Sequence, residues 1–377
     1  MPFLLGICIG LPYFGAGTNA SEPIEFPSSR TYFYVGGHYL SDGTDSDVYT
    51  DQMYVERLTP VAGTSRSEPI IFIHGQAQTG TNWLNTPDGR EGWASWFLRH
   101  GYEVYIVDQP QRGRSPYMPG DGTLATYSAE QISELFTGVQ HYDQWPQAHL
   151  HTQWPGAGQK GDPIFDQFYA SQIQFQNDST EVQRINQAGG AALLDRVGAA
   201  HIIAHSQAGP LGFLIADARP DLVKSMVLLE PQGPPFQQRI ISNSTAIVLP
   251  YGLTSIPLTY DPPVSNQTTV HLPFEDHAPA APGLTDCLLQ SSPPKRLDHL
   301  AGVPMLIVTS EASFHAGFDY CTVKYLQQGG VDAQYYNLSE AGIHGNAHFF
   351  FMEKNNLEIA THVRKWIDDP SLRVSSL

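Results

Sequence analysis

The sequence predicts an α/β fold with a parallel sheet, helices between its strands and lid-like insertions in its loops. Three observations support this prediction. Short apolar runs alternate along the chain with segments whose apolar residues recur at helical spacing. Some runs, such as PIIFIHG at 69–75, are apolar throughout, as expected of strands buried on both faces. One such run, at 202–204, passes through a tight turn at Ser206 into a helical pattern.

The individual elements can be assigned in order along the chain. Alternating apolar and polar residues across 30–60, interrupted by SDGTDSD, predict an antiparallel hairpin. Beyond it the apolar runs predict strands at 69–75, 102–108, 202–204, 223–230, 302–310 and 333–339. Helical spacing predicts helices at 92–101, 188–198, 211–220, 321–330 and 355–367.

Two long segments interrupt this alternation and are interpreted as insertions at 116–180 and 231–302. The second is rich in paired prolines and is expected to form a lid over the site. The first contains His149 and His151 as HLH, which in a polar, proline-flanked loop indicates exposed side chains rather than metal ligands. At 377 residues the chain fits one large catalytic domain, 21–377.

Several features indicate export from the cell. Residues 1–20 have the apolar core and small flanking residues of a signal peptide cut near Ala20, although a positive flank is missing. Cys287 and Cys321 remain in the mature chain as an even pair, which predicts a disulfide in an oxidising compartment. Sequons predict N-glycosylation within the mature chain at Asn177, Asn243, Asn266 and Asn337.

The composition excludes some partners. A net charge of −17 argues against nucleic acid or an anionic membrane surface as a partner. Because the positive flank is missing, an uncleaved anchor is the alternative to a signal peptide. The apolar start is short for a membrane span and is interrupted by glycines and a proline, so stable membrane insertion is not expected. We therefore expect a secreted, extracellular protein, while the sequence does not specify its oligomeric state.

The turn at Ser206 has alanines two residues before and after it, the small residues that a strained strand-to-helix turn needs around a nucleophilic serine. A His-Gly pair at 74–75 and the DQPQRGRS segment at 108–115 precede it, each after a predicted strand, and a histidine follows the last strand. These ordered motifs resemble the α/β-hydrolase superfamily from about Pro69 to the end of the chain. The resemblance implies a doubly wound, mostly parallel sheet with helices on both faces, and Ser206 as the nucleophile.

A serine hydroxyl needs a base to take its proton, and an imidazole suits this task. Two histidines, His344 and His348, follow the last predicted strand. The family's histidine usually precedes an acidic residue by five positions, and Glu353 stands five residues after His348. The GNAH…EKNN stretch also resembles a smaller, secreted esterase-like branch of the family. We therefore predict His348 as the base, with His344 as the alternative.

An acid must hold that imidazole in one tautomer. In most of the family it follows the seventh strand, but Ser313 stands in that position here, which leaves Glu311, Asp319 or a carboxylate from another strand. The resembling esterase branch carries its acid after the sixth strand, where this chain has Glu230. Glu230 is therefore the predicted acid, and Glu311 is the main alternative.

The oxyanion formed during attack on an ester needs backbone N–H donors. The predicted donors are Gln207, directly after the nucleophile, and Gln76, after the His-Gly pair, with Ala77 as an alternative to Gln76. Trp83 and the phenylalanines at 349–351 could line a pocket or pack in the core, and core packing is favoured for the phenylalanines.

The predicted function is that of a secreted serine hydrolase, with a Ser-His-Glu triad, that cleaves small-molecule or polymeric carboxylic esters through an acyl-enzyme. No cofactor and no metal are expected. Ser206 argues against epoxide hydrolases and dehalogenases of this fold, which need an aspartate at the turn. A lactonase, thioesterase, peptidase or lyase could use the same triad. A catalytically silent binding protein of the same fold is the alternative from another class.

Overall fold

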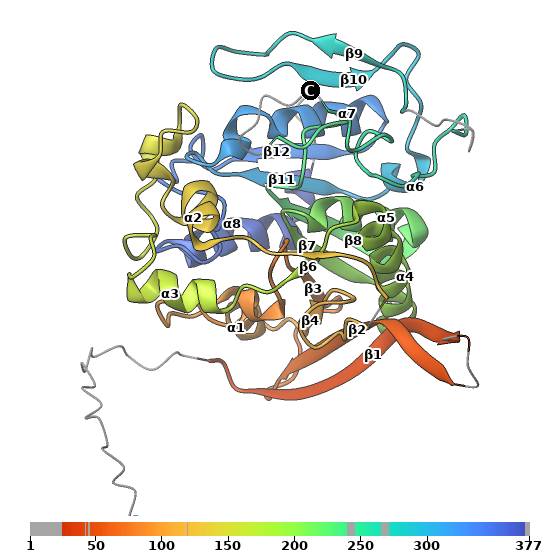
Figure 1. Ribbon diagram of the computed structural model, residues 1–377, viewed down its shortest axis with the longest axis vertical. Helices are drawn as coiled ribbons and strands as arrows, with labels where there is room; N and C mark the ends of the chain where they lie inside the picture. The colour runs from red at the N-terminus through yellow and green to blue at the C-terminus, as the bar shows by residue number, and fades with distance from the viewer. Residues whose placement is uncertain are drawn as a thin grey trace, which may run out of the picture.

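The computed structural model describes residues 25–41, 43, 46–118, 120–239, 246–264 and 271–373. The predicted signal peptide and the sequons at Asn243 and Asn266 lie outside this part of the chain. Eight strands of the described residues form a central sheet in the order β1-β2-β4-β3-β7-β8-β11-β12 (Figure 1). The prediction of a doubly wound, mostly parallel sheet is confirmed.

The sheet begins with an antiparallel hairpin and continues with parallel strands. The predicted hairpin is present as β1 (Ser28–Ser41) and β2 (Asp47–Pro60), and β2 also pairs antiparallel with β4 (Val104–Asp108). The strands on the other side of β4 all run parallel to it, namely β3 (Ile70–Ile73), β7 (Ala200–His205), β8 (Val223–Leu229), β11 (Met305–Thr309) and β12 (Ala333–Asn337). Two short pairs stand apart from this sheet, β5 (Leu124–Ala125) with β6 (Phe175–Gln176) and β9 (Phe274–His277) with β10 (Cys287–Gln290).

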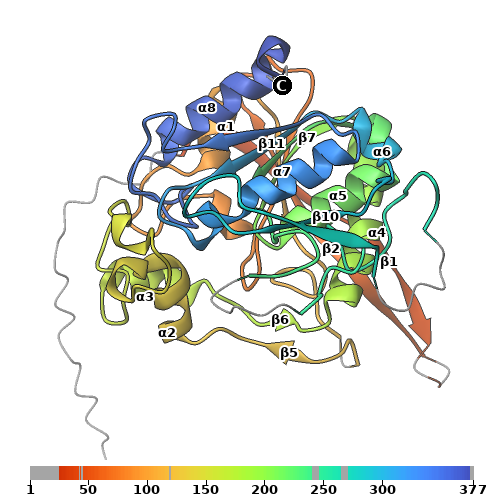
Figure 2. The ribbon, with the colours of Figure 1, turned by 90° about the horizontal axis from the view of Figure 1, so that it is seen from above.

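Helices cover both faces of the sheet, as Figure 2 shows from above. One face carries α1 (Trp93–Arg99) and α8 (Asn356–Asp368), and the other carries α4 (Ser179–Val197), α5 (Ala208–Ala218) and α7 (Asp319–Gln328). Successive side chains of a strand point to opposite faces, so each central strand contributes to two separate cores. In β3, Ile71 and Ile73 belong to the core under α4 and α5, whereas Ile70 and Phe72 belong to the core under α1 and α8.

The helix that leads to β7 begins earlier than the apolar pattern predicts. The pattern places its start at residue 188, but α4 begins at Ser179. The Asp178 carboxylate caps it by accepting hydrogen bonds from the N–H groups of Thr180 and Glu181. The added turns contain two buried apolar residues three positions apart, Val182 and Ile185, but the polar residues around them made this spacing too sparse to indicate the start of the helix.

The two insertions take different places around the sheet. The first contains α2 (Ala129–Ile132) and α3 (Pro163–Ala170), which lie together at one end of the molecule in both views (Figures 1 and 2). The second contains the β9–β10 hairpin and α6 (Asp298–Ala301). The predicted disulfide between Cys287 and Cys321 is present and ties β10 to α7. The role of either insertion as a lid remains a prediction. No helix within the described ranges has the length and apolar character to cross a membrane.

Candidate active site

Ser206 stands on the turn between β7 and α5, half-buried and with a φ of 56°. Positive φ is costly for a residue with a Cβ, and such strain concentrates at functional sites. Hydrogen bonds hold the turn in place: the Ser206 N–H donates to the Leu229 carbonyl (3.0 Å), and the Ser206 carbonyl accepts from the N–H groups of Gly209 and Gln232 (both 2.9 Å). Glu230 and Ala77 also have positive φ, 46° and 60°. Three segments that meet at the serine are therefore strained.

The loop after β3 packs directly on this turn. A Cβ on Gly75 would lie 2.9 Å from His205 Nδ1 and 3.1 Å from Ser206 Cβ, so only glycine fits there. The buried ring of His74 accepts a hydrogen bond from the Gln109 N–H at Nε2 (3.1 Å), which leaves its proton on Nδ1 to donate to the Gly75 carbonyl (2.8 Å). Burial lowers the pKa of His74 to about 4, so this neutral tautomer is a fixed structural support.

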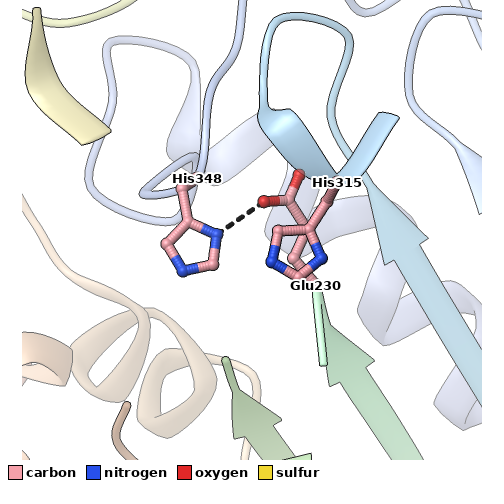
Figure 3. Close-up of side chains that lie close together, drawn as sticks. All are labelled: Glu230, His315 and His348. Atoms are coloured by element: carbon pink, nitrogen blue, oxygen red, sulfur yellow. Dashed lines mark hydrogen bonds and ion pairs between the residues drawn. The ribbon is translucent and has the colours of Figure 1, made fainter. Parts of the chain in front are cut away.

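His348 and Glu230 are brought together from distant parts of the chain. Glu230 directly follows β8, the neighbour of the serine's strand, and its Oε2 lies 2.6 Å from His348 Nδ1 (Figure 3). The same oxygen accepts from the Ser313 hydroxyl (2.7 Å), and Oε1 accepts from the N–H (2.8 Å) and hydroxyl (2.6 Å) of Ser310. Glu230 is fully buried, and all four donors stabilise its charged form.

The electrostatics of this pair favour a carboxylate beside a neutral imidazole. Burial lowers the pKa of His348, the Glu230 hydrogen bond and charge oppose that shift, and the neighbouring His315 adds to it, with a net lowering from 6.5. Burial on its own would raise the pKa of Glu230, but the His348 hydrogen bond and nearby positive charge hold it below its usual value. A neutral imidazole with its proton on Nδ1 leaves Nε2 free to accept a proton.

The alternative residues form two other pairs. His344 lies 3.0 Å from Glu311 through its Nδ1, and its side chain is 62% exposed, so this pair belongs to the surface. Asp319 is buried and accepts hydrogen bonds from His315 Nδ1 and from the Thr309 hydroxyl, both at 2.7 Å. Of the predicted histidines, His348 alone lines the same pocket as Ser206 among the described residues.

His315 is a pocket residue that sequence reasoning missed. Its ring lies parallel to that of His348, with centroids 5.0 Å apart, and burial raises the pKa of its partner Asp319 to about 6. The signal for this pair was the four-residue spacing of the histidine and the aspartate in FHAGFD. Glu230, His315 and His348 place their ligand atoms within 4.8 Å of one another, and within the described ranges this trio is the one group of at least three such residues that could hold a metal.

The expectation of an exposed HLH segment is wrong for one of its histidines. His149 is exposed, but His151 is only 3% exposed and lies 2.7 Å from Glu353. The Glu353 carboxylate also accepts from Asn346 Nδ2 (2.7 Å) and from the Ala347 N–H (3.2 Å). The buried pair therefore anchors the loop that carries His348, and its long separation in sequence hid this from the local pattern.

The DQPQRGRS segment does not line the pocket, and its residues instead stabilise the loops around it. Asp108 accepts hydrogen bonds from the Gly80 N–H and the Arg114 N–H, both at 2.8 Å, and forms an ion pair with the Arg114 side chain. A Cβ on Gly113 would lie 2.6 Å from Asp108 Oδ2, which explains the glycine. The motif therefore joins the loops after β3 and β4.

The pocket above Ser206 has a cavity volume of about 40 Å³. Gln76 and Gln207 both line it, and their N–H groups donate to no hydrogen bond found among the described residues. Its other walls come from the first insertion (Tyr127, Ile132, Phe136, Gln172), from the start of the second (Gln232, Gly233, Gln238, Arg239) and from the strand ends (Gln78, His205, Phe314, His315, His348, Phe349).

Aromatic packing separates pocket residues from core residues. Trp83 is fully buried and stacks between Phe72 (centroids 4.7 Å apart) and Phe351 (4.5 Å). Phe350 and Phe351 are likewise core residues, as favoured from the sequence, while the buried Phe349 also lines the pocket.

The two sequons that the structure describes differ in setting. Asn177 is exposed. Asn337 is half-buried at the end of β12, where its Oδ1 accepts from the N–H (3.1 Å) and hydroxyl (2.9 Å) of Ser339. Glycosylation of either remains a prediction.

Comparison with known proteins gives consistent matches. A family model described as alpha/beta hydrolase fold matches residues 68–258. The chain is 50% identical over 341 residues to a protein named probable secreted lipase phiG, from Fungal sp. (strain ATCC 74256), covering 89% of each chain. It also resembles the solved structure of a novel bacterial esterase, with 21% identity and a TM-score of 0.62 over 93% of this chain and 98% of that one. At that identity the structural likeness concerns the fold.

Proposed function

This chain belongs to the α/β-hydrolase family, and we propose that it is a serine hydrolase that cleaves carboxylic esters through an acyl-enzyme intermediate. One observation carries the proposal. The strained Ser206 shares a pocket with His348, and that histidine is bonded at Nδ1 to the buried Glu230 carboxylate. Ser206, Glu230 and His348 each follow a different strand, and a serine with a base and an orienting acid is the set of groups that nucleophilic catalysis needs.

In the proposed reaction Ser206 Oγ attacks the ester carbonyl carbon while His348 Nε2 takes the hydroxyl proton. The carbonyl oxygen becomes an oxyanion that accepts hydrogen bonds from the N–H groups of Gln207 and Gln76. Collapse of this intermediate breaks the bond to the alcohol, which leaves with the proton from His348. A water molecule then attacks the acyl-enzyme by the same route and releases the acid and free Ser206. Throughout, Glu230 holds the Nδ1 proton and stabilises the imidazolium.

The pocket favours a small group beside the scissile bond. Its volume of about 40 Å³ compares with roughly 10–15 Å³ for one water on the same measure. Ile132, Phe136, Phe314 and Phe349 give it apolar walls, so short, apolar acyl groups fit best. The name of the fungal relative, a probable lipase, supports an ester substrate.

We further propose that the protein is secreted, with residues 1–20 as its signal peptide. The relative is named a probable secreted lipase, and the sequons and the cysteine pair of this chain suit an oxidising compartment. Protein sequencing of the mature amino terminus from the native host tests this. A start near Ser21 is expected, and an unprocessed terminus on extracellular protein would contradict the signal peptide.

Labelling with a fluorophosphonate tests the catalytic proposal, since this reagent phosphonylates activated serines. The wild-type protein should be labelled and should hydrolyse nitrophenyl esters, fastest with short acyl chains. Ser206→Ala and His348→Ala should abolish both, while His344→Ala, a change of the same kind in the same loop, should keep both. An unlabelled wild-type protein, or one labelled equally after Ser206→Ala, would make this a non-catalytic protein of the same fold.

A further inference from the structure

We propose that Arg112 is a positioning residue that joins the two backbone segments of the oxyanion site and adds a buried positive charge behind them. This inference rests on the proposed function, because it assigns Arg112 a role toward the oxyanion of that reaction. Arg112 lies in the loop after β4 and is 2% exposed.

The guanidinium contacts both halves of the site. One terminal nitrogen donates to the Gly75 carbonyl (3.0 Å), and the other donates to Gln207 Oε1 (2.6 Å). Gly75 precedes Gln76, and Gln207 follows the nucleophile. A single planar side chain therefore links the peptide unit before Gln76 to the side chain of Gln207, the two residues whose N–H groups are the proposed oxyanion donors.

The contact with Gly75 also fixes the orientation of the Gln76 N–H. The Gly75 carbonyl and the Gln76 N–H belong to one peptide unit, which is planar, so fixing the oxygen fixes the direction of the N–H. Two donors hold that oxygen, Arg112 at 3.0 Å and His74 Nδ1–H at 2.8 Å. Hydrogen bonds accepted by a peptide carbonyl polarise the N–H of the same unit and strengthen it as a donor. This favours Gln76 over Ala77 as the second oxyanion donor.

The charge on Arg112 has no counter-ion in the part of the chain that the structure describes. No carboxylate there lies within ion-pair distance of it, whereas Arg114, two residues further on, pairs with both Asp108 and Glu56. Burial lowers the pKa of Arg112 to about 9, so it stays protonated at neutral pH. A buried, unpaired charge is expensive to maintain. In the proposed reaction the oxyanion forms in the pocket lined by Gln76 and Gln207, next to the residues that Arg112 contacts, and this negative charge is present only during the reaction.

The experiment compares steady-state kinetics with the binding of a trifluoromethyl ketone, which forms an anionic hemiketal with the serine. Removing a direct oxyanion donor costs about 10²–10³ in kcat, so an indirect loss in Arg112→Met should be roughly 10- to 100-fold. KM should change little, and the inhibition constant of the ketone should rise by the same factor as kcat falls. Arg112→Lys should weaken the contacts with Gly75 and Gln207, and Gln207→Met removes the contact with Gln207 alone. Both variants should lose less kcat and less ketone affinity than Arg112→Met.

Arg114→Met is the matched control, because it removes an arginine from the same loop without touching the oxyanion segments. It should lower the melting temperature and leave ketone affinity at the wild-type value. If Arg112→Met fails to fold, the two milder variants decide. Wild-type kcat and ketone affinity in folded Arg112→Lys and Gln207→Met would overturn the inference. An inactive, unlabelled wild-type protein would instead overturn the proposed function.

Discussion

Replacing Glu230 with glutamine is the sharpest test of the proposed triad, because it changes one oxygen of a fully buried group to nitrogen. The hydrogen bonds around Glu230 decide which of its two oxygens the amide nitrogen replaces. Oε1 accepts a hydrogen bond from the Ser310 N–H at 2.8 Å. Because a backbone N–H can only donate and cannot rotate, the amide oxygen of the glutamine must occupy this position. The amide NH₂ then takes the place of Oε2, opposite the Ser313 hydroxyl and His348 Nδ1.

That exchange forces the wrong tautomer on the base. The Ser313 hydroxyl can rotate to accept a hydrogen bond, but His348 can accept from the new NH₂ only if Nδ1 carries no proton. The proton then sits on Nε2, which no longer accepts the serine proton. The analogous change in the Ser-His-Asp triad lowers kcat about 10⁴-fold with the geometry intact. We therefore expect kcat of Glu230→Gln to fall by about the same factor.

The kcat of Glu230→Gln and of a control variant is measured with a nitrophenyl ester, and melting temperatures confirm that both proteins are folded. Glu311→Gln is the matched control, since its carboxylate contacts the exposed His344 and the Gly345 N–H at the surface. It should keep near-normal turnover. Near-normal turnover in Glu230→Gln together with collapse in Glu311→Gln would refute the reasoning and move the acid to the loop after β11.

Three further outcomes are expected. Only neutral imidazole can take the serine proton, and burial lowers the pKa of His348 from 6.5. The value of kcat/KM should therefore fall as the pH decreases, with a midpoint below 6.5. A midpoint above 7 in the pH profile would contradict this. Replacing both Cys287 and Cys321 with serine should destabilise the fold by about 3–4 kcal/mol, because the bridge closes a loop of 34 residues. Urea titration measures the loss, and unchanged stability would count against it. Dialysis against a chelator should leave turnover unchanged, since every proposed step uses protein groups; loss of activity that Zn²⁺ restores would assign the Glu230, His315 and His348 group a metal instead.

Most strands of the central sheet could be anticipated because each depends on a local pattern in the chain. Continuous apolar runs predict strands that are buried on both faces, and β3, β4, β7 and β11 are buried throughout. β8 includes one exposed lysine, and the edge strand β12 is mostly half-buried. The turn at Ser206 was equally visible, since small residues and a strand-to-helix change lie within ten positions. The first turns of α4 were missed because only two apolar residues, Val182 and Ile185, lie among their polar residues, and the capping Asp178 stands before them.

Pairings across long separations were open in the sequence and are fixed by the tertiary structure. Glu230, Glu311 and Asp319 are all acids near strand ends, and spacing alone could not rank them physically. Glu230 and His348 are 118 positions apart in sequence, but folding brings Glu230 Oε2 to 2.6 Å from His348 Nδ1. Glu311 and Asp319 instead contact other histidines, His344 and His315. Arg112 shows the same limit, because a buried cation is recognised only once its surroundings are known. The sequence by itself determined most strands and helices of the central sheet and the turn at Ser206, since these depend on neighbouring residues. Only the packing of the sheet decided which charged side chains are buried together, because burial and contact depend on the whole chain.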